Sequence, residues 1–325
     1  MPLACEYGKE CYVSRYFDHS GPKDEKAADY TCGNLSAHKY ASTDFILSDR
    51  GGEEKNVMAL AADAGVVAFA RDGLEDVDVR LVGEEAVRGR ECGNGVVISH
   101  ERGYSTQYCH LKKGSVLVKP GQNVERGDRV GDVGLSGNAS FPHLKFTVLK
   151  NDLPVDPFTG EDPLSEGETM PCGAVNLYPL WDRKTEKRLA YVAAAVLDGG
   201  FSDVPPNEFG AAEGRFRAFS FSTSQPFLIF WSFIFGAQEG DAIQVEMYGP
   251  GGQLLKKDVR RVVAGETRRF QYVAARRPKD SWSVGNYRVD VIVSRSAGGY
   301  ASEVARRSFS ATAMGASSAP KKNNK

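Results

Sequence analysis

Long apolar runs and an excess of charge of one sign are both missing from this sequence of 325 residues. The longest apolar stretch, residues 226–237, is well short of the ~20 residues that a helix needs to cross a bilayer. The 41 Lys and Arg residues nearly balance the 42 Asp and Glu residues, so no overall field attracts nucleic acid. We therefore expect no transmembrane segment and no nucleic-acid partner.

A signal peptide is also missing, because the chain opens MPLACEYGKE without an apolar core segment. The six cysteines form no paired CxxC motif, and their even number is typical of disulfides in an oxidising compartment. We expect the mature form of a periplasmic or secreted protein, from which a leader has been removed. The alternative is a cytosolic protein with six reduced, buried thiols.

Glycine is abundant relative to proline, with 35 residues against 15, which favours many tight turns and a mainly β fold. The length is suited to two domains. We expect a cysteine-bearing arm, a β-sheet domain, a linker with one helix, an immunoglobulin-like β-sandwich and a disordered tail, at residues 1–37, 38–158, 159–205, 206–312 and 313–325.

Two details of the second half follow from local pattern. Residues 184–197 (KTEKRLAYVAAAVL) predict the linker helix, which Gly199 and Gly200 would end. Trp282 lies in the polar stretch PKDSWSVGNY and is expected to be exposed enough to contact a ligand.

The first half contains the stretches GNGVVISHERGYSTQYCHL, VKPGQNVERGDRVGDVGLSGNASFPHL and SAHKYASTDF, which resemble motifs of the lysostaphin-like (LytM-type) peptidoglycan metallopeptidases. GNGVVISHERGYSTQYCHL matches that family's GNxVxIxH strand followed by GYxTxYxHL. VKPGQNVERGDRVGDVGLSGNASFPHL matches its G-Q-x-V-x-x-G hairpin and the following SG…PHLHF strand. SAHKYASTDF lies where the family has H-x-G-x-D, with two extra residues between His and Asp and no glycine. The resemblance implies a LytM-type β-sheet peptidase domain.

In that family a zinc ion is held by two imidazoles and one carboxylate, and two further histidines position the attacking water and stabilise the oxyanion. The resemblance makes His38 and Asp44 zinc ligands, and His110 and His143 the catalytic pair. The third ligand would be the second histidine of an HLH triplet, but this chain has Lys145 there.

Lys145 changes the expected chemistry of the site. Positions 143 and 145 of a strand point to the same side, so the lysine ammonium would stand where an imidazole belongs. A lysine cation offers no lone pair, and we expect zinc to bind weakly or not at all. Lys145 could instead pair with Asp44, or burial could make it a neutral amine ligand.

Cys92 and Cys109 flank the two strands of one hairpin and are expected to form a disulfide. A buried thiol or a nucleophile at Cys109 are the alternatives, although adjacent strand residues face opposite sides. Three pairings remain open for the other four cysteines: Cys5, Cys11, Cys32 and Cys172.

The resemblance gives the other two histidines no role in the zinc site. His100 is expected to order a turn. His19 is expected to be a surface residue beside Asp18, with a substitute metal ligand as the alternative.

The sequence therefore favours a cell-wall protein with a degenerate zinc endopeptidase site. Such a protein would bind peptidoglycan stem peptides or regulate a cell-wall hydrolase. The first alternative is an active zinc metalloendopeptidase that hydrolyses peptidoglycan peptide cross-links, which the retained His110 and His143 favour. The second is an adhesion module that binds through its C-terminal sandwich.

Overall fold

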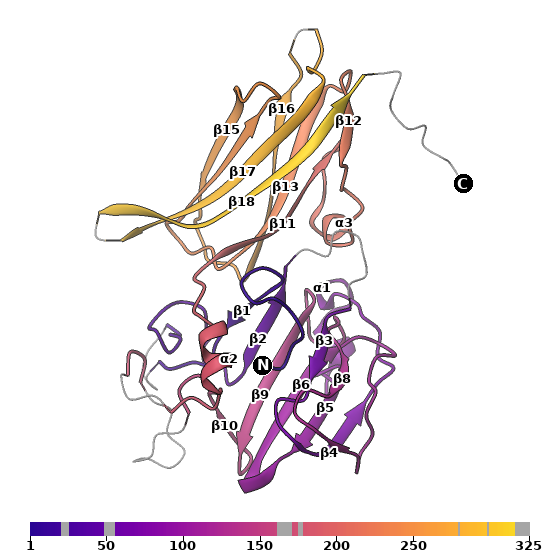
Figure 1. Ribbon diagram of the computed structural model, residues 1–325, viewed down its shortest axis with the longest axis vertical. Coiled ribbons are helices and arrows are strands. Elements are labelled where there is room, and N and C mark those ends of the chain that lie inside the picture. The colour runs from indigo at the N-terminus through magenta and orange to yellow at the C-terminus, as the bar shows by residue number, and fades with distance from the viewer. Residues whose placement is uncertain are drawn as a thin grey trace. The chain divides into compact units, whose positions relative to one another are not determined.

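The computed structural model describes residues 1–20, 26–48, 56–160, 171–174, 178–278, 280–297 and 299–315. The chain divides into two compact units (Figure 1). Unit 1 comprises Met1–Leu47 and Lys55–Val192, and unit 2 comprises Ser48–Glu54 and Ala193–Lys325. Both are built mainly of strands, which confirms the predicted fold class. Within the described ranges, no helix is long and apolar enough to cross a membrane.

An antiparallel sheet of eight strands forms the body of unit 1. Its order is β1-β2-β9-β6-β5-β4-β7, and β10 pairs with β9. The bounds are β1 (Cys11–Arg15), β2 (Thr43–Leu47), β4 (Gly65–Arg71), β5 (Asn94–Ser99), β6 (Tyr104–Leu111), β7 (Asn123–Val124), β9 (His143–Lys150) and β10 (Leu153–Val155). A second, two-stranded sheet contains β3 (Met58–Leu60) and β8 (Arg129–Asp132). The remaining short elements are α1 (Val79–Val82), η1 (Glu84–Val87) and η2 (Glu101–Gly103).

The sequence of β9, HLKFTVLK, alternates between two environments. Leu144 and Phe146 are fully buried, and the Phe146 ring packs 5.4 Å from the ring of its cross-strand partner Tyr108. Burying each such side chain contributes about 2 kcal/mol. Because side chains alternate along a strand, this apolar face leaves His143 and Lys145 together on the opposite one.

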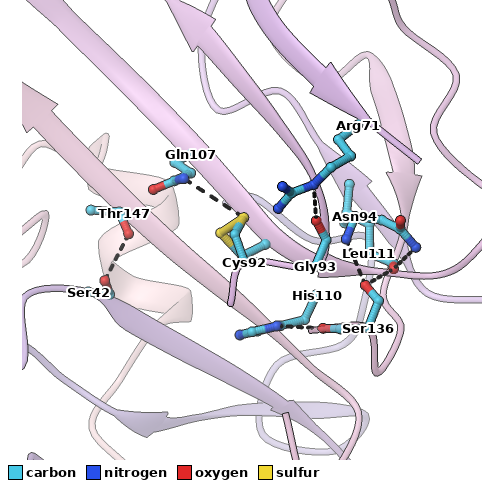
Figure 2. Close-up of a disulfide and its surroundings, with 11 residues drawn as sticks. Ser42, Arg71, Cys92, Gly93, Asn94, Gln107, His110, Leu111, Ser136 and Thr147 are labelled. Carbon is cyan, nitrogen blue, oxygen red and sulfur yellow. Dashed lines mark hydrogen bonds between the residues drawn. A yellow bond between two sulfur atoms is a disulfide. The ribbon is translucent and has the colours of Figure 1, made fainter. Parts of the chain in front are cut away.

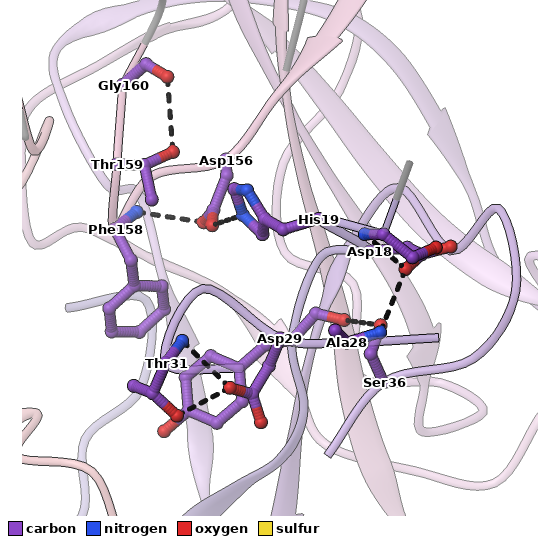
Figure 3. A network of polar contacts seen from close by, with 12 residues as sticks. Asp18, His19, Ala28, Asp29, Thr31, Ser36, Asp156, Phe158, Thr159 and Gly160 are labelled. Carbon is purple, nitrogen blue, oxygen red and sulfur yellow. Dashed lines mark hydrogen bonds and ion pairs between the residues drawn. The ribbon is translucent and has the colours of Figure 1, made fainter. Parts of the chain in front are cut away.

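The N-terminal arm is part of the sheet, since β1 pairs with β2. Farther along the arm, His19 Nε2 lies 2.7 Å from Asp156 Oδ2, and neither side chain has any solvent exposure (Figure 3). A disulfide between Cys32 and Cys172 also connects the arm to the segment that follows Asp156 in the sequence. Both expectations for His19 are therefore wrong, because it is a buried partner of Asp156 and neither a surface residue nor a spare ligand.

The predicted linker helix is shorter than residues 184–197. Helix α2 covers Arg183–Arg188, and the Asp182 side chain caps it by accepting hydrogen bonds from the backbone N–H groups of Lys184 and Thr185. Ala195–Ser202 form strand β11, which is buried along its whole length and pairs with β13 (Phe227–Phe235). A short apolar run can form either a buried strand or a helix. Here the run forms a strand because it pairs with β13.

Unit 2 contains two sheets that share one hydrophobic core. The first has the order β11-β13-β16, and the second β12-β18-β17-β14-β15. The remaining bounds are β12 (Ser220–Ser222), β14 (Ala242–Tyr248), β15 (Leu254–Arg261), β16 (Arg268–Arg276), β17 (Gly285–Ala297), β18 (Tyr300–Met314) and α3 (Glu208–Ala212). Unit 2 begins at Ala193, ahead of the expected start at residue 206, because β11 belongs to its sheet. The immunoglobulin-like topology stays a prediction. Of the predicted tail, residues 316–325 lie outside the described ranges.

Candidate functional site

One row of side chains crosses four neighbouring strands of unit 1. The register pairs Arg15 with Asp44, Asp44 with Lys145, and Lys145 with Cys109. Residues directly opposite each other in an antiparallel sheet project to the same face, with Cβ atoms about 5 Å apart. His143 lies two residues before Lys145 on β9 and shares this face.

The row lines a pocket of about 450 Å³. Four side chains that the family motifs single out line it: Asp44, His110, His143 and Lys145. The other polar side chains around the pocket include Arg15, Tyr40, Glu91, Gln107 and Asn138. The structure therefore brings together four of the five residues named from the sequence.

Asp44 is buried and has several polar neighbours. The Tyr40 hydroxyl donates a hydrogen bond of 2.5 Å to Asp44 Oδ1, while Arg15 Nη1 and His143 Nε2 each lie 4.0 Å from Oδ2. Burial, with the Asp44 carboxylate beside it, raises the pKa of Tyr40 well above its usual value. Tyr40 therefore keeps its proton and remains a donor to Asp44.

Lys145 does not pair with Asp44, which contradicts one of the two alternatives raised for it. Throughout the described ranges, no carboxylate oxygen lies within 4.0 Å of the Lys145 ammonium. The ammonium instead lies 5.2 Å from the centroid of the Tyr40 ring, in a cation–π contact. The positive charge faces a pocket whose carboxylate is already held by Tyr40.

His110 reaches the pocket through an unusual backbone conformation. Its φ is 66°, in the left-handed region that costs most residues about 1 kcal/mol. The strand register also shifts between Asn94 and Val96, next to it. This local turn explains how His110 and its neighbour Cys109 can both line the pocket, although adjacent strand residues ordinarily face opposite sides.

A disulfide and a polar network support this turn (Figure 2). Cys92 and Cys109 are bonded, as predicted, and the backbone N–H of His110 donates to the Cys92 carbonyl. The Ser136 hydroxyl donates to the carbonyl of Leu111 and accepts from the N–H of Asn94. With Cys109 in a disulfide, the alternatives of a free thiol or a nucleophile at this position are wrong.

The two pocket histidines are held in the same tautomer. Nδ1 of His110 lies 2.8 Å from the carbonyl oxygen of Ser136, and Nδ1 of His143 lies 2.8 Å from the carbonyl oxygen of Phe141. A carbonyl oxygen only accepts, so each Nδ1 carries a proton, and the buried, neutral ring of His110 keeps a lone pair on Nε2. The ring centroids are 4.7 Å apart.

The environment of His110 predicts a pH dependence of stability. Burial, with smaller contributions from His143 and Lys145, lowers the pKa of His110 from 6.5 to about 3. Between these pH values the unfolded chain binds a proton that the folded chain does not. The contribution of His110 to the free energy of unfolding is therefore fully present above pH 6.5 and is lost as the pH falls toward 3. When the pH is lowered from 7 to 5, the free energy of unfolding of the unchanged protein should fall by about 2 kcal/mol more than that of a His110→Asn variant.

Urea unfolding at the two pH values measures this difference. An NMR titration provides an independent check, because the ring signals of His110 should stay unchanged from pH 8 to 5 in the folded protein. A midpoint near pH 6.5 for that ring would contradict the expected neutral state.

His38 is the one predicted site residue that the structure does not bring to the pocket. It is exposed in a turn and does not line the cavity. Tyr40 stands four residues before Asp44, the spacing that the H-x-G-x-D pattern gives to its histidine, and Tyr40 is the residue that contacts Asp44. The prediction chose His38 because it is a histidine, whereas the four-residue spacing to Asp44 points to Tyr40.

The donor set does not fit the family's zinc. Of the two imidazoles and one carboxylate that the resemblance implies, only Asp44 is present, since Tyr40 and Lys145 take the two imidazole positions. Tyr40 directs its proton at the carboxylate, and the lysine cation has no lone pair. Within the part of the chain that the structure describes, no group of three His, Cys, Asp or Glu side chains is arranged to hold a metal.

Comparison with known proteins agrees with the motifs. Residues 51–157 match the model of peptidase family M23, a segment that includes His110, His143 and Lys145 and begins after Asp44. The peptidoglycan DD-endopeptidases ShyB and ShyA of Vibrio cholerae are 42% and 41% identical to this chain over 74 and 73 residues. These segments cover 23% and 22% of this chain and only 17% and 16% of the two relatives.

Among solved structures, a zinc-containing peptidase from Vibrio cholerae is similar over 48% of this chain and 41% of its own, with 24% sequence identity and a TM-score of 0.28. The sequence matches, rather than this structural similarity, identify the family. Residues 51–157 carry a peptidase family M23 (LytM-type) domain.

Proposed function

We propose that this chain is an exported cell-wall protein whose M23 domain binds without cutting, either to peptidoglycan stem peptides or to a cell-wall hydrolase that it regulates. The observation that carries the proposal is the pair Tyr40 and Lys145, which stand at both positions where the family pattern has an imidazole ligand. Losing two of three ligands removes the Lewis acid on which the hydrolysis depends.

The residues around the former metal position support a retained binding role. A buried carboxylate without a partner would destabilise the fold, but Tyr40 donates to Asp44 and Arg15 lies nearby. The site therefore keeps its shape through side-chain contacts alone. A groove that stays built without metal can still recognise the peptide for which its walls are shaped.

An extracytoplasmic location agrees with three disulfides, Cys5–Cys11, Cys32–Cys172 and Cys92–Cys109. Two of the relatives are peptidoglycan endopeptidases by name, and peptidoglycan lies outside the cytoplasm. We place the protein in the periplasm or among secreted proteins on these grounds.

An active zinc endopeptidase that cuts peptide cross-links is the second candidate. His110 and His143 favour it, because their Nδ1–H bonds to backbone carbonyls leave both Nε2 atoms available in the pocket. That arrangement is the one a general base needs.

Incubation with purified, cross-linked sacculi separates the two candidates. The protein is expected to sediment with the sacculi and to release no soluble muropeptides at equimolar or excess zinc. An EDTA-treated sample should bind equally well, since binding does not depend on metal. Release of cross-linked fragments in proportion to time, abolished by EDTA, would establish the endopeptidase and overturn the proposal.

A further inference from the structure

The pocket of the M23 domain presents a cation where the family pattern places a metal ligand. Lys145 is partly buried, faces the pocket and has no carboxylate within 4.0 Å in the described ranges. Arg15 lines the same wall beside Asp44. Among the acidic residues of the pocket, Asp44 accepts from Tyr40, and Glu91 is exposed at the rim and accepts from the backbone N–H of Gly89.

A partly buried ammonium without an ion pair favours an anionic ligand. Two unit charges about 4 Å apart attract by about 4 kcal/mol at the effective dielectric of a protein surface, and the gain is largest where water is excluded. The hydrogen bonds that such a ligand accepts from Lys145 or Arg15 are charge-assisted, which makes them stronger than those between neutral groups.

The histidines restrict which anion suits the pocket. Nε2 of His110 is an acceptor, because this buried ring donates through Nδ1 to the Ser136 carbonyl and stays neutral. A sulfate brings only acceptor oxygens and would meet this lone pair unfavourably. A peptide that ends in a free carboxylate brings an amide N–H next to its negative charge and satisfies both kinds of group.

We propose that this pocket is a receptor for the free carboxylate end of a peptide, held by Lys145 and Arg15 while its neighbouring amide N–H donates to a histidine. The inference rests on the proposed non-hydrolytic function and makes it more specific. An uncut cross-link is neutral at the bond that a peptidase attacks, whereas a stem peptide that is not cross-linked, or has been cut, ends in a carboxylate. The domain would thus distinguish the free end of a stem peptide from the amide bond of a cross-link.

Calorimetric titration of the full chain with a lysine-type muramyl pentapeptide tests the inference. The peptide with its free C-terminal carboxylate should bind about 10-fold or more tightly than the same peptide with a C-terminal carboxamide. Equal affinity for the two would overturn the carboxylate inference and leave the proposed function intact. Shortening of either peptide, detected by mass spectrometry after the titration, would overturn the proposed function instead.

The α-carboxylate of D-glutamate in the same peptide is a second source of this chemistry. A third peptide, amidated at the glutamate only, separates the two sources. It should bind as tightly as the unmodified peptide. If amidation of the glutamate weakens binding and amidation of the terminus does not, the pocket does not recognise the chain end.

Variants at Lys145 test whether this side chain causes the preference for the free carboxylate over the carboxamide. Lys145→Met should weaken binding of the free acid by about 10-fold and leave the carboxamide unchanged. Lys145→Arg keeps the charge and should keep most of the preference. Lys150→Met provides a matched control, since Lys150 ends the same strand outside the pocket and contacts the Tyr104 ring. A preference that survives Lys145→Met undiminished would contradict the assignment.

Discussion

Replacing Tyr40 and Lys145 together by histidine is expected to give a protein that retains about one zinc ion per chain after dialysis, which the unchanged protein should not do. The double variant supplies two imidazoles on either side of Asp44, the set that the family pattern contains. Even residues that only support a metal ligand are worth about 10- to 100-fold in affinity. Restoring two ligands should therefore tighten zinc binding by at least about 100-fold.

The single variants show whether both positions matter. Lys145→His alone leaves Tyr40 bonded to Asp44, and Tyr40→His alone leaves a cation opposite that carboxylate. Each should bind zinc much more weakly than the pair. Metal analysis of untagged protein, dialysed first against a slight excess of zinc and then against buffer, measures the content. Stoichiometric zinc in the unchanged protein would mean that another ligand exists and would end the non-hydrolytic interpretation.

Regular strand pairing made much of the site predictable from sequence. The Cys92–Cys109 disulfide and the pocket positions of His143 and Lys145 follow from hairpin geometry and from period-2 alternation, both of which are local. The pocket position of His110 depends on a backbone conformation that the strand alternation does not predict. Its left-handed φ rotates the side chain into the pocket beside Cys109, against strict alternation.

The segment before Asp44 was harder to interpret because it is a loop. Loop positions have no period from which a side chain's direction follows, so the assignment of His38 as a ligand rested on its residue type. Spacing to Asp44 favours Tyr40, and the structure agrees.

Two further predictions differ from the structure because residues that are distant in the sequence bury the side chains concerned. Trp282 sits in a polar stretch yet is 2% exposed, because its Nε1–H donates to the Gln225 carbonyl and its ring packs edge-on against Phe221 and Tyr287. His19 is likewise buried by a residue 137 positions away, Asp156. No window of the sequence contains these partners, so composition suggested exposure for residues that the fold encloses.

The disulfides of the N-terminal arm are expected to differ strongly in their contribution to stability. Cys32 and Cys172 are 140 residues apart in sequence, whereas Cys5 and Cys11 are 6 apart. Since a cross-link stabilises mainly by reducing the entropy of the unfolded chain, the long loop should contribute about 5 kcal/mol and the short one about 2 kcal/mol. Cys32→Ser/Cys172→Ser should therefore destabilise unit 1 by about 3 kcal/mol more than Cys5→Ser/Cys11→Ser.

Hydrogen exchange in increasing urea, followed by mass spectrometry on peptides from β6 and β9, reports on unit 1 separately from unit 2. A loss of about 5 kcal/mol equals the whole stability of many domains, so the Cys32→Ser/Cys172→Ser variant should show substantial exchange even without urea. Equal losses in the two variants would mean that native contacts, such as the buried pair His19–Asp156, already hold the arm in place. The expected difference would instead show that closing the longer loop contributes more to the stability of unit 1, so that reduction of the Cys32–Cys172 bond destabilises the domain that forms the pocket.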